Sequence, residues 1–229
     1  MMYRFWLPPL LALCVLLLAP SLRAQQSWYP ITADDGSPVA NHRVPVELTS
    51  ELDELPGAVV VGNPRGTIIV HEFYDLNCPF CRVAAADIPA IIKQEKELKL
   101  VLVPYPVLGI PSIQAARIEL AVAKLATPAT FYEFHRKIYQ GRGVVDDRRA
   151  LTVARDLGLD LKKLADIAND DAIIETMKVH ARLGNALGLV ATPSFIVMDA
   201  AILGYPGKKA LRNIIRSAGR CGRVVCRAR

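Results

Sequence analysis

The sequence lacks the features of several common protein classes. After its first 24 residues it has no apolar run long enough to span a bilayer, and it has no internal repeat or low-complexity tract. Histidine is scarce, and no two of the four histidines are spaced i, i+4 on one predicted helix: His42, His71, His135 and His180. These absences argue against a further membrane span, a repeat architecture and a histidine-based metal site.

The beginning of the chain has the pattern of an export signal. Arg4 precedes an apolar stretch at 5–19, and Pro20 and Ala24 follow it. The apolar stretch is interrupted by two prolines and is shorter than the ~20 residues of a spanning helix. We therefore expect residues 1–24 to be a signal peptide cleaved after Ala24. An uncleaved membrane tether is the alternative, because Leu22 is large where a small residue is usual.

Cysteine is also sparse. The chain has five cysteines among 229 residues, and Cys14 lies inside the predicted signal. The four that remain are Cys78, Cys81, Cys221 and Cys226. An even number of cysteines in an exported chain indicates an oxidising compartment.

The remainder of the chain alternates between strand and helix patterns, and 52% of the sequence is hydrophobic, which favours a substantial core. Residues 25–64 predict an N-terminal extension of turns and short strands, with apolar pieces at 44–48 and 58–61. Strand, helix and strand patterns follow at 67–74, 79–97 and 98–103, and then two strands at 195–198 and 201–203 with a helix at 208–217. Five helices are predicted between these two groups: 112–126, 128–140, 147–157, 161–168 and 171–187. The element order is β-α-β, helices, β-β-α.

The motif Cys78-Pro79-Phe80-Cys81 falls where the strand at 67–74 gives way to a helix. The i, i+3 spacing places both sulfurs on one side of the first helical turn, and Pro79 suits the first helical position. Free backbone N–H groups and the helix dipole favour a thiolate there, and a thiolate is the form that attacks disulfides. A redox-active pair is the leading interpretation. Zinc binding is disfavoured, because Cys221 and Cys226 have the wrong spacing for a second ligand pair and lie beyond the last predicted helix.

The segment EFYDLNCPFC at 72–81, combined with ATPSF at 191–195, resembles the DsbA-like thiol:disulfide oxidoreductases. The resemblance covers about 59–218. It implies an α/β thioredoxin fold (β-α-β … β-β-α) with an inserted all-helical subdomain. The predicted divisions are 65–108 for the first half of the fold, 109–190 for the helical insertion, 191–219 for the second half and 220–229 for a basic, cysteine-containing tail.

The resemblance also implies roles for individual residues. Cys78 would be the exposed nucleophile and Cys81 the buried resolving thiol. Thr192 and Pro193 would form a loop with a cis peptide bond that lies against the cysteines and contacts substrate. Glu72 would be a buried acid that helps to move the proton of Cys81. The alternative for Glu72 is an edge or surface position of the strand.

Two features leave alternatives open. Pro79 and Phe80 form the redox-tuning dipeptide, and Phe80 replaces the histidine of the oxidising prototype, so the direction of electron flow is not fixed by the motif. Cys221 and Cys226 are expected to close a small structural loop, with a second exchange site as the alternative. The arginines around them lack interleaved aromatic residues, so nucleic acid is not an expected partner.

These observations predict an exported, periplasmic enzyme that introduces or exchanges disulfides in other cysteine-containing exported proteins and needs no cofactor. A membrane redox partner would reset its active site. One alternative is a periplasmic reductase or isomerase; isomerases of this kind usually dimerise through a dedicated domain, and 25–64 shows no long helix for one. The other is a non-catalytic module that binds a soft metal, copper or zinc, through the same cysteines.

Overall fold

The computed structural model describes residues 28–226. The predicted signal peptide at 1–24 and its cleavage site lie outside the described residues. Within 28–226, no helix combines the length and the apolar character that crossing a membrane requires.

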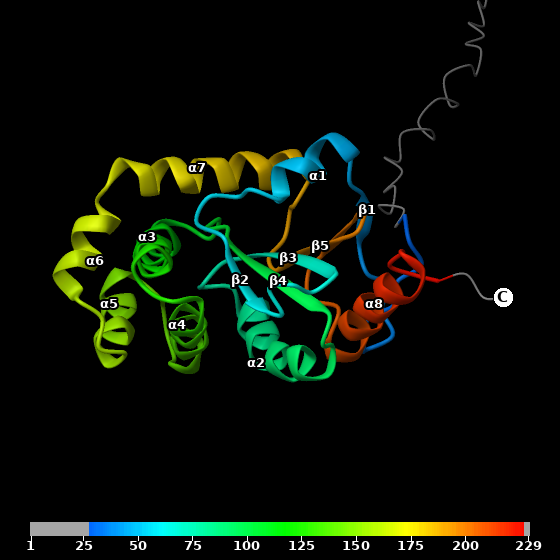
Figure 1. The fold of residues 1–229 in the computed structure, drawn as a ribbon, viewed down its shortest axis with the longest axis horizontal. Helices are drawn as coiled ribbons and strands as arrows, with labels where there is room; N and C mark the ends of the chain where they lie inside the picture. The colour runs from blue at the N-terminus through cyan, green and yellow to red at the C-terminus, as the bar shows by residue number, and fades with distance from the viewer. Residues whose placement is uncertain (1–27, 227–229) are drawn as a thin grey trace, which may run out of the picture.

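The described residues form a mixed six-stranded sheet with helices on both faces (Figure 1), which confirms the predicted α/β thioredoxin fold. The strand order is β1-β6-β5-β3-β4-β2. The central β3 (Ile68–Tyr74) pairs in parallel with β4 (Leu98–Pro104) and antiparallel with β5 (Ser194–Val197), which continues into β6 (Ala200–Leu203). Because side chains alternate along a strand, β3 contributes Val70 and Tyr74 to one core and Phe73 to the other.

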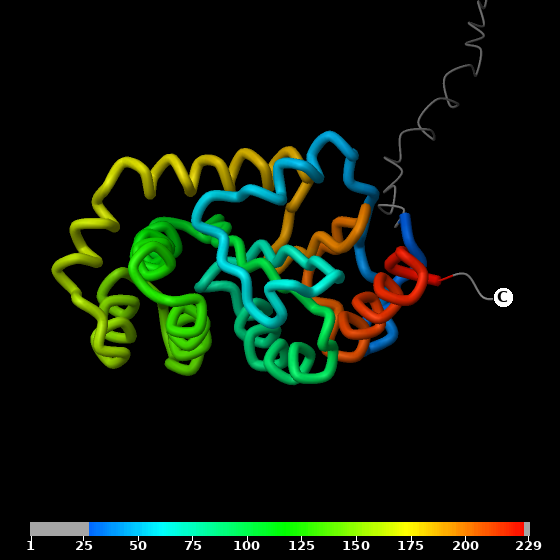
Figure 2. The backbone as a smooth tube through the Cα atoms, viewed as in Figure 1, coloured from blue at the N-terminus to red at the C-terminus, as the bar shows by residue number. Residues whose placement is uncertain are grey.

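Helix α2 (Pro79–Gln94) and helix α8 (Lys208–Cys221) cover one face of the sheet. Helix α7 (Asp171–Ala186) and the short α1 (Val46–Leu52) cover the other face. The first face shares its core with four of the five helices of the insertion, those that precede α7 in the chain. They are α3 (Ile110–Leu125), α4 (Pro128–Gln140), α5 (Asp147–Asp156) and α6 (Leu161–Ala168). The tube in Figure 2 shows α7, the fifth helix of the insertion, running back from the other four along the sheet.

The N-terminal extension contributes to the fold more than the sequence predicts. Its strand β1 (Asn41–Arg43) pairs with β6, and its strand β2 (Val59–Gly62) pairs with β4, so the extension supplies both edges of the sheet. The prediction of only turns and short strands is wrong at 46–52, where α1 is helical. Pro45 precedes the first turn of α1, and Leu52 is buried against the core beneath α7.

The last helix is also longer than predicted. Helix α8 was expected to end at Ser217, but it continues to Cys221 and stops at Gly222, which has a φ of 67°. This left-handed conformation is one that glycine adopts without a steric penalty. Cys221 is therefore the final residue of a core helix, and its predicted position beyond that helix is wrong.

Candidate functional site: a cysteine pair at the start of a helix

Cys78 and Cys81 lie at the junction between β3 and the start of α2, as predicted. Cys78 is the residue that caps α2, and its backbone N–H donates to the carbonyl oxygen of Asp75 at 3.0 Å. The backbone N–H of Cys81 donates to the Cys78 sulfur, with an N–S distance of 3.4 Å. Both cysteines are buried free thiols, so the expected exposure of Cys78 is wrong: only 5% of its surface is exposed, because the Thr192 loop lies against it. Pro79 begins the helix, and Phe80 is 63% exposed beside the sulfurs.

The loop at Thr192 and Pro193 lies against this pair. The Thr192–Pro193 peptide bond is cis, as the family resemblance implies. In the thiol form, Cys78 Sγ donates to the carbonyl oxygen of Thr192 at 3.0 Å. The loop reaches this position because Ser194, the first residue of β5, pairs with Phe73 near the end of β3. Two segments more than a hundred residues apart therefore meet at one sulfur atom.

The two thiols have opposite acidities. A hydrogen bond from the Cys81 thiol is the largest cause that lowers the pKa of Cys78 to about 6. A further hydrogen bond from the side chain of Thr192, and hydrogen bonds from backbone N–H groups at the start of α2, act in the same direction, and burial opposes them. At Cys81, burial raises the pKa far above its ordinary value, and the hydrogen bond with Cys78 adds to this effect. This asymmetry matches an attacking thiolate beside a protonated partner.

Glu72 lies on the central strand of the sheet with 1% of its surface exposed. The alternative of an edge or surface position is therefore wrong. Its Oε2 atom has no hydrogen-bond partner among the described residues. Burial is the main cause that raises the pKa of Glu72 to about 8, and the negative charges of Cys78 and Glu119 raise it further. A buried carboxyl with this pKa can hold or release a proton near neutral pH.

Asp75 anchors the turn before Cys78, and sequence reasoning gave it no role. It is buried, and Oδ1 accepts hydrogen bonds from the Asn77 N–H at 2.7 Å and from the Ser112 hydroxyl at 2.7 Å. Its Oδ2 accepts from the N–H groups of Val107 and Leu108 at 2.8 and 2.9 Å. Four donors compensate the desolvation of this carboxylate. An aspartate two residues before an asparagine is a turn signal that could have indicated it.

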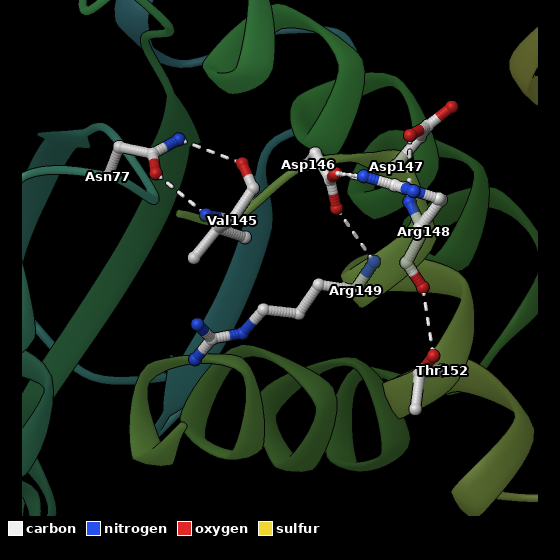
Figure 3. A network of polar contacts seen from close by, with 7 residues as sticks. All are labelled: Asn77, Val145, Asp146, Asp147, Arg148, Arg149 and Thr152. Atoms are coloured by element: carbon white, nitrogen blue, oxygen red, sulfur yellow. Dashed lines mark hydrogen bonds and ion pairs between the residues drawn. The ribbon is translucent and has the colours of Figure 1, made fainter. Parts of the chain in front are cut away.

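Asn77 connects the same turn to the helical insertion. Its side-chain amide donates to the Val145 carbonyl oxygen at 2.8 Å, and its carbonyl oxygen accepts from the Val145 N–H at 2.8 Å (Figure 3). Asp146, the next residue, caps α5 by accepting from the Arg149 N–H at 3.0 Å. The Arg149 guanidinium in turn donates to carbonyl groups at 138, 142 and 143. The loop at 141–146 is thus fixed beside the cysteines.

The second cysteine pair is elsewhere and is oxidised. Cys221 and Cys226 form a disulfide, as the prediction of a small structural loop expected. Gly219, two residues before Cys221, packs against Ile68, the first residue of β3. Cys78 lies just beyond the other end of that strand. The two pairs therefore lie near opposite ends of β3. Residues 28–226 hold no group of three or more His, Cys, Asp or Glu side chains that could bind a metal.

The sequence matches the model of a known protein family. Residues 69–216 match the model of the DSBA-like thioredoxin domain. The chain belongs to this family. Members of the family are thiol:disulfide oxidoreductases, and so is this DSBA-like protein.

Several solved structures are similar to the chain. A thioredoxin-like oxidoreductase from Silicibacter pomeroyi DSS-3 is 31% identical, with a TM-score of 0.67 over 72% of this chain and 94% of that one. The thiol-disulfide exchange protein alpha-DsbA2 from Wolbachia pipientis is 25% identical, with a TM-score of 0.67 over 75% and 94%. A periplasmic thioredoxin-like protein from Salmonella enterica serovar Typhimurium, 22% identical, shares the fold with a TM-score of 0.68 over 77% and 98%. No curated protein gives a significant match to the chain.

Proposed function

We propose that this oxidoreductase is exported and that it introduces or exchanges disulfides in other exported proteins through Cys78 and Cys81. The observation that carries the proposal is the Cys78 sulfur, a free thiol of lowered pKa at a helix N-terminus in contact with Thr192. Similarity to a thiol-disulfide exchange protein supports the same chemistry. The leader at 1–24 supports export to a periplasm, where the structurally similar Salmonella protein is found.

The reaction begins with the oxidised enzyme, in which Cys78 and Cys81 are joined. A substrate thiolate attacks Cys78, forms a mixed disulfide with it and releases Cys81 as a thiolate. A second substrate thiolate then attacks the substrate sulfur of the mixed disulfide. This step forms the substrate disulfide and releases the Cys78 thiolate, so two electrons pass from the substrate to the enzyme. A membrane redox partner would accept these electrons and restore the Cys78–Cys81 bond.

Glu72 would supply the proton for the first step. With a pKa of about 8, it is mostly protonated at pH 7, whereas a thiolate at buried Cys81 is strongly disfavoured. Proton transfer from Glu72 to Cys81 therefore accompanies opening of the disulfide, and the reverse transfer prepares Cys81 to attack. The charge left on Glu72 is disfavoured by burial, so its proton must be regained from solvent before the next cycle.

Exposed apolar side chains around Cys78 suggest the kind of client. Phe80 lies between the two cysteines, and Val190 lies two residues before Thr192. Leu108 and Val144 lie on the loops that Asp75 and Asn77 hold in place. These side chains are 50% or more exposed. A cluster of exposed apolar residues beside a reactive sulfur suits an unfolded or partly folded chain, which exposes its own apolar side chains.

The acidity of Cys78 favours the oxidising direction over the reductase or isomerase alternative. A pKa of about 6 stabilises the reduced enzyme at pH 7 by about 1.4 kcal/mol, which corresponds to about 30 mV. A more stable reduced form makes the oxidised form a stronger electron acceptor. Membership of an oxidoreductase family argues against the alternative of a non-catalytic metal-binding module.

Two measurements test the proposal. Equilibration with glutathione should give a reduction potential for the Cys78–Cys81 couple well above the about −270 mV of thioredoxin. A Cys81→Ala variant that carries glutathione on Cys78 as a mixed disulfide should exchange it for reduced, unfolded ribonuclease, releasing glutathione as the leaving thiol and accumulating a mixed disulfide with the ribonuclease, whereas Cys78→Ala should accumulate none. A potential at or below that of thioredoxin would reverse the direction, and absence of trapping would remove Cys78 as the nucleophile.

A further inference from the structure

A pair of ionisable side chains is buried between the sheet and the helical insertion, next to the active-site turn. Glu119 on α3 and His135 on α4 are 0% and 2% exposed. His135 Nδ1 lies 3.0 Å from Glu119 Oε1, and Glu119 Oε2 has no partner within the described part of the chain. Burial of such groups is costly. The mechanism proposed above uses neither of them.

Two tyrosines connect His135 to the turn that carries Cys78. The ring of Tyr74 lies edge-on to the imidazole at a centroid distance of 4.6 Å, and the ring of Tyr139 does so at 5.2 Å. The Tyr139 hydroxyl donates to the carbonyl oxygen of Asp75 at 3.1 Å. The same carbonyl accepts the backbone N–H of Cys78. The buried pair therefore belongs to one continuous cluster with the reactive turn.

The cluster surrounds Glu72 with other titratable groups from several elements of the fold. Strand β4 contributes none opposite Glu72, because Leu102 is its register partner. The groups that act on one another are Glu72 and Tyr74 of β3, Cys78 and Cys81 at the start of α2, Glu119 of α3, Tyr132, His135 and Tyr139 of α4, and Tyr205 after β6. The negative charge of Glu119 raises the pKa of both Glu72 and Tyr74, after burial.

We propose that Glu119, held in place by His135, is a positioning residue whose buried negative charge sets the pH at which Glu72 exchanges a proton with Cys81. The inference rests on the proposed roles of Cys78, Cys81 and Glu72. His135 supplies the hydrogen bond that stabilises the Glu119 carboxylate away from water. A like charge near Glu72 makes its carboxyl retain a proton to a higher pH, so Glu119 keeps Glu72 able to protonate Cys81 at neutral pH.

The test uses the Glu119→Gln variant, which removes the charge while retaining an oxygen that can accept from His135. The reduced enzyme is first mixed with oxidised glutathione, so that the Cys78 thiolate breaks its disulfide, binds one glutathione as a mixed disulfide and releases the other as a thiolate. Release of the bound glutathione by Cys81 is then followed by stopped flow from pH 5 to 10. Release requires deprotonation of Cys81, so its rate rises with pH as Glu72 becomes a carboxylate. We expect the midpoint of this rise to move down by about half a pH unit or more in the variant.

The control is Glu133→Gln, which removes the charge of an exposed glutamate on α4 that pairs with Lys137. Its profile should match that of the parent. In a Glu72→Gln background, Glu119→Gln should shift the midpoint much less, because the intermediary is gone. An unchanged profile in a folded Glu119→Gln variant, or an equal shift in both backgrounds, would overturn the inference.

Two further results keep the test decisive. If Glu119→Gln does not fold, carbon-13 NMR of the parent reports the carboxyl of Glu119 directly, and a protonated carboxyl from pH 6 to 9 would overturn the inference. If the parent forms no glutathione mixed disulfide at Cys78, the proposed function fails instead. Normal exchange in the parent with no shift in the variant leaves that function intact and rejects only the role of Glu119.

Discussion

The two cysteine pairs of the described residues occupy opposite ends of helices. Cys78 caps the N-terminus of α2, where its sulfur accepts a backbone N–H, whereas Cys221 is the last residue of α8. The Cys221 sulfur lies 3.2 Å from the carbonyl oxygen of Ser217. Free N–H groups stabilise a thiolate, and free carbonyl groups destabilise it. The first pair is present as thiols, and the second is closed as a disulfide.

The difference indicates that the end of the helix at which a cysteine pair lies, more than the spacing between its two cysteines, distinguishes a reactive pair from a structural one. Both pairs are close in sequence and both have the geometry to close a small ring. Only Cys78 has a second loop, at Thr192, that contributes to lowering its pKa, and only this pair has a buried acid on the adjacent strand. Three predictions test this contrast between the two cysteine pairs.

The largest expected effect comes from exchanging sulfur for oxygen in each pair. Cys78→Ser should reduce disulfide exchange by about a thousandfold or more, because a hydroxyl cannot form the mixed disulfide. The double variant Cys221→Ser and Cys226→Ser should stay within about twofold of the parent, because its sulfurs lie at the other end of β3. Insulin reduction measures both. A large loss in the double variant would favour a second exchange site.

The stability of the fold, in contrast to its activity, should depend on the Cys221–Cys226 pair. Removing the tail disulfide should lower the free energy of unfolding by about 2 kcal/mol, the entropic value for closing a loop with a sequence separation of five residues. Urea denaturation of the oxidised proteins measures this difference. Adding reductant should bring the parent down toward the variant, and equal stabilities without reductant would show that the disulfide does not stabilise the fold.

The smallest expected effect is in reactivity at low pH. Because the pKa of Cys78 is lowered to about 6, half of it is thiolate at pH 6, and the thiolate fraction falls away below that pH. An ordinary cysteine, with a pKa of about 8.5, is almost wholly thiol there. After allowing for the weaker nucleophilicity of an acidic thiolate, alkylation of Cys78 by iodoacetamide at pH 6 should be about tenfold faster than that of reduced Cys221. Equal alkylation rates at the two cysteines would contradict the lowered pKa of Cys78.

The sequence predicts the turn that bears Cys78 and Cys81 and the helical insertion well because their signals are local. Helices α4 and α6 have the bounds predicted, since each is preceded by a residue whose side chain caps it, Thr127 and Asp160. The cis bond before Pro193 was expected from the family motif alone. The edge strands and α1 were harder to predict, because their partners are distant in sequence and short apolar runs have no clear period.

The buried polar network could not be predicted for a related reason. Glu119 and His135 belong to different helices, and either one alone resembles a solvated helical residue. Only the packing of α3 against α4 brings their side chains together in a dry core. Asp75 was quoted within a motif, yet three of its four donors lie at 107–112, more than thirty residues further along the chain, and meet it only in the folded protein.

The extension that supplies both edges of the sheet has a protective consequence. Without β1 and β2, the seven-residue β4 would present an open row of backbone donors and acceptors along one border. The borders are instead formed by strands of three and four residues, which offer a poor template for an additional strand. Short border strands thereby reduce the risk that an extended polypeptide, the kind of client proposed for this protein, pairs with the edge of the sheet and starts an aggregate.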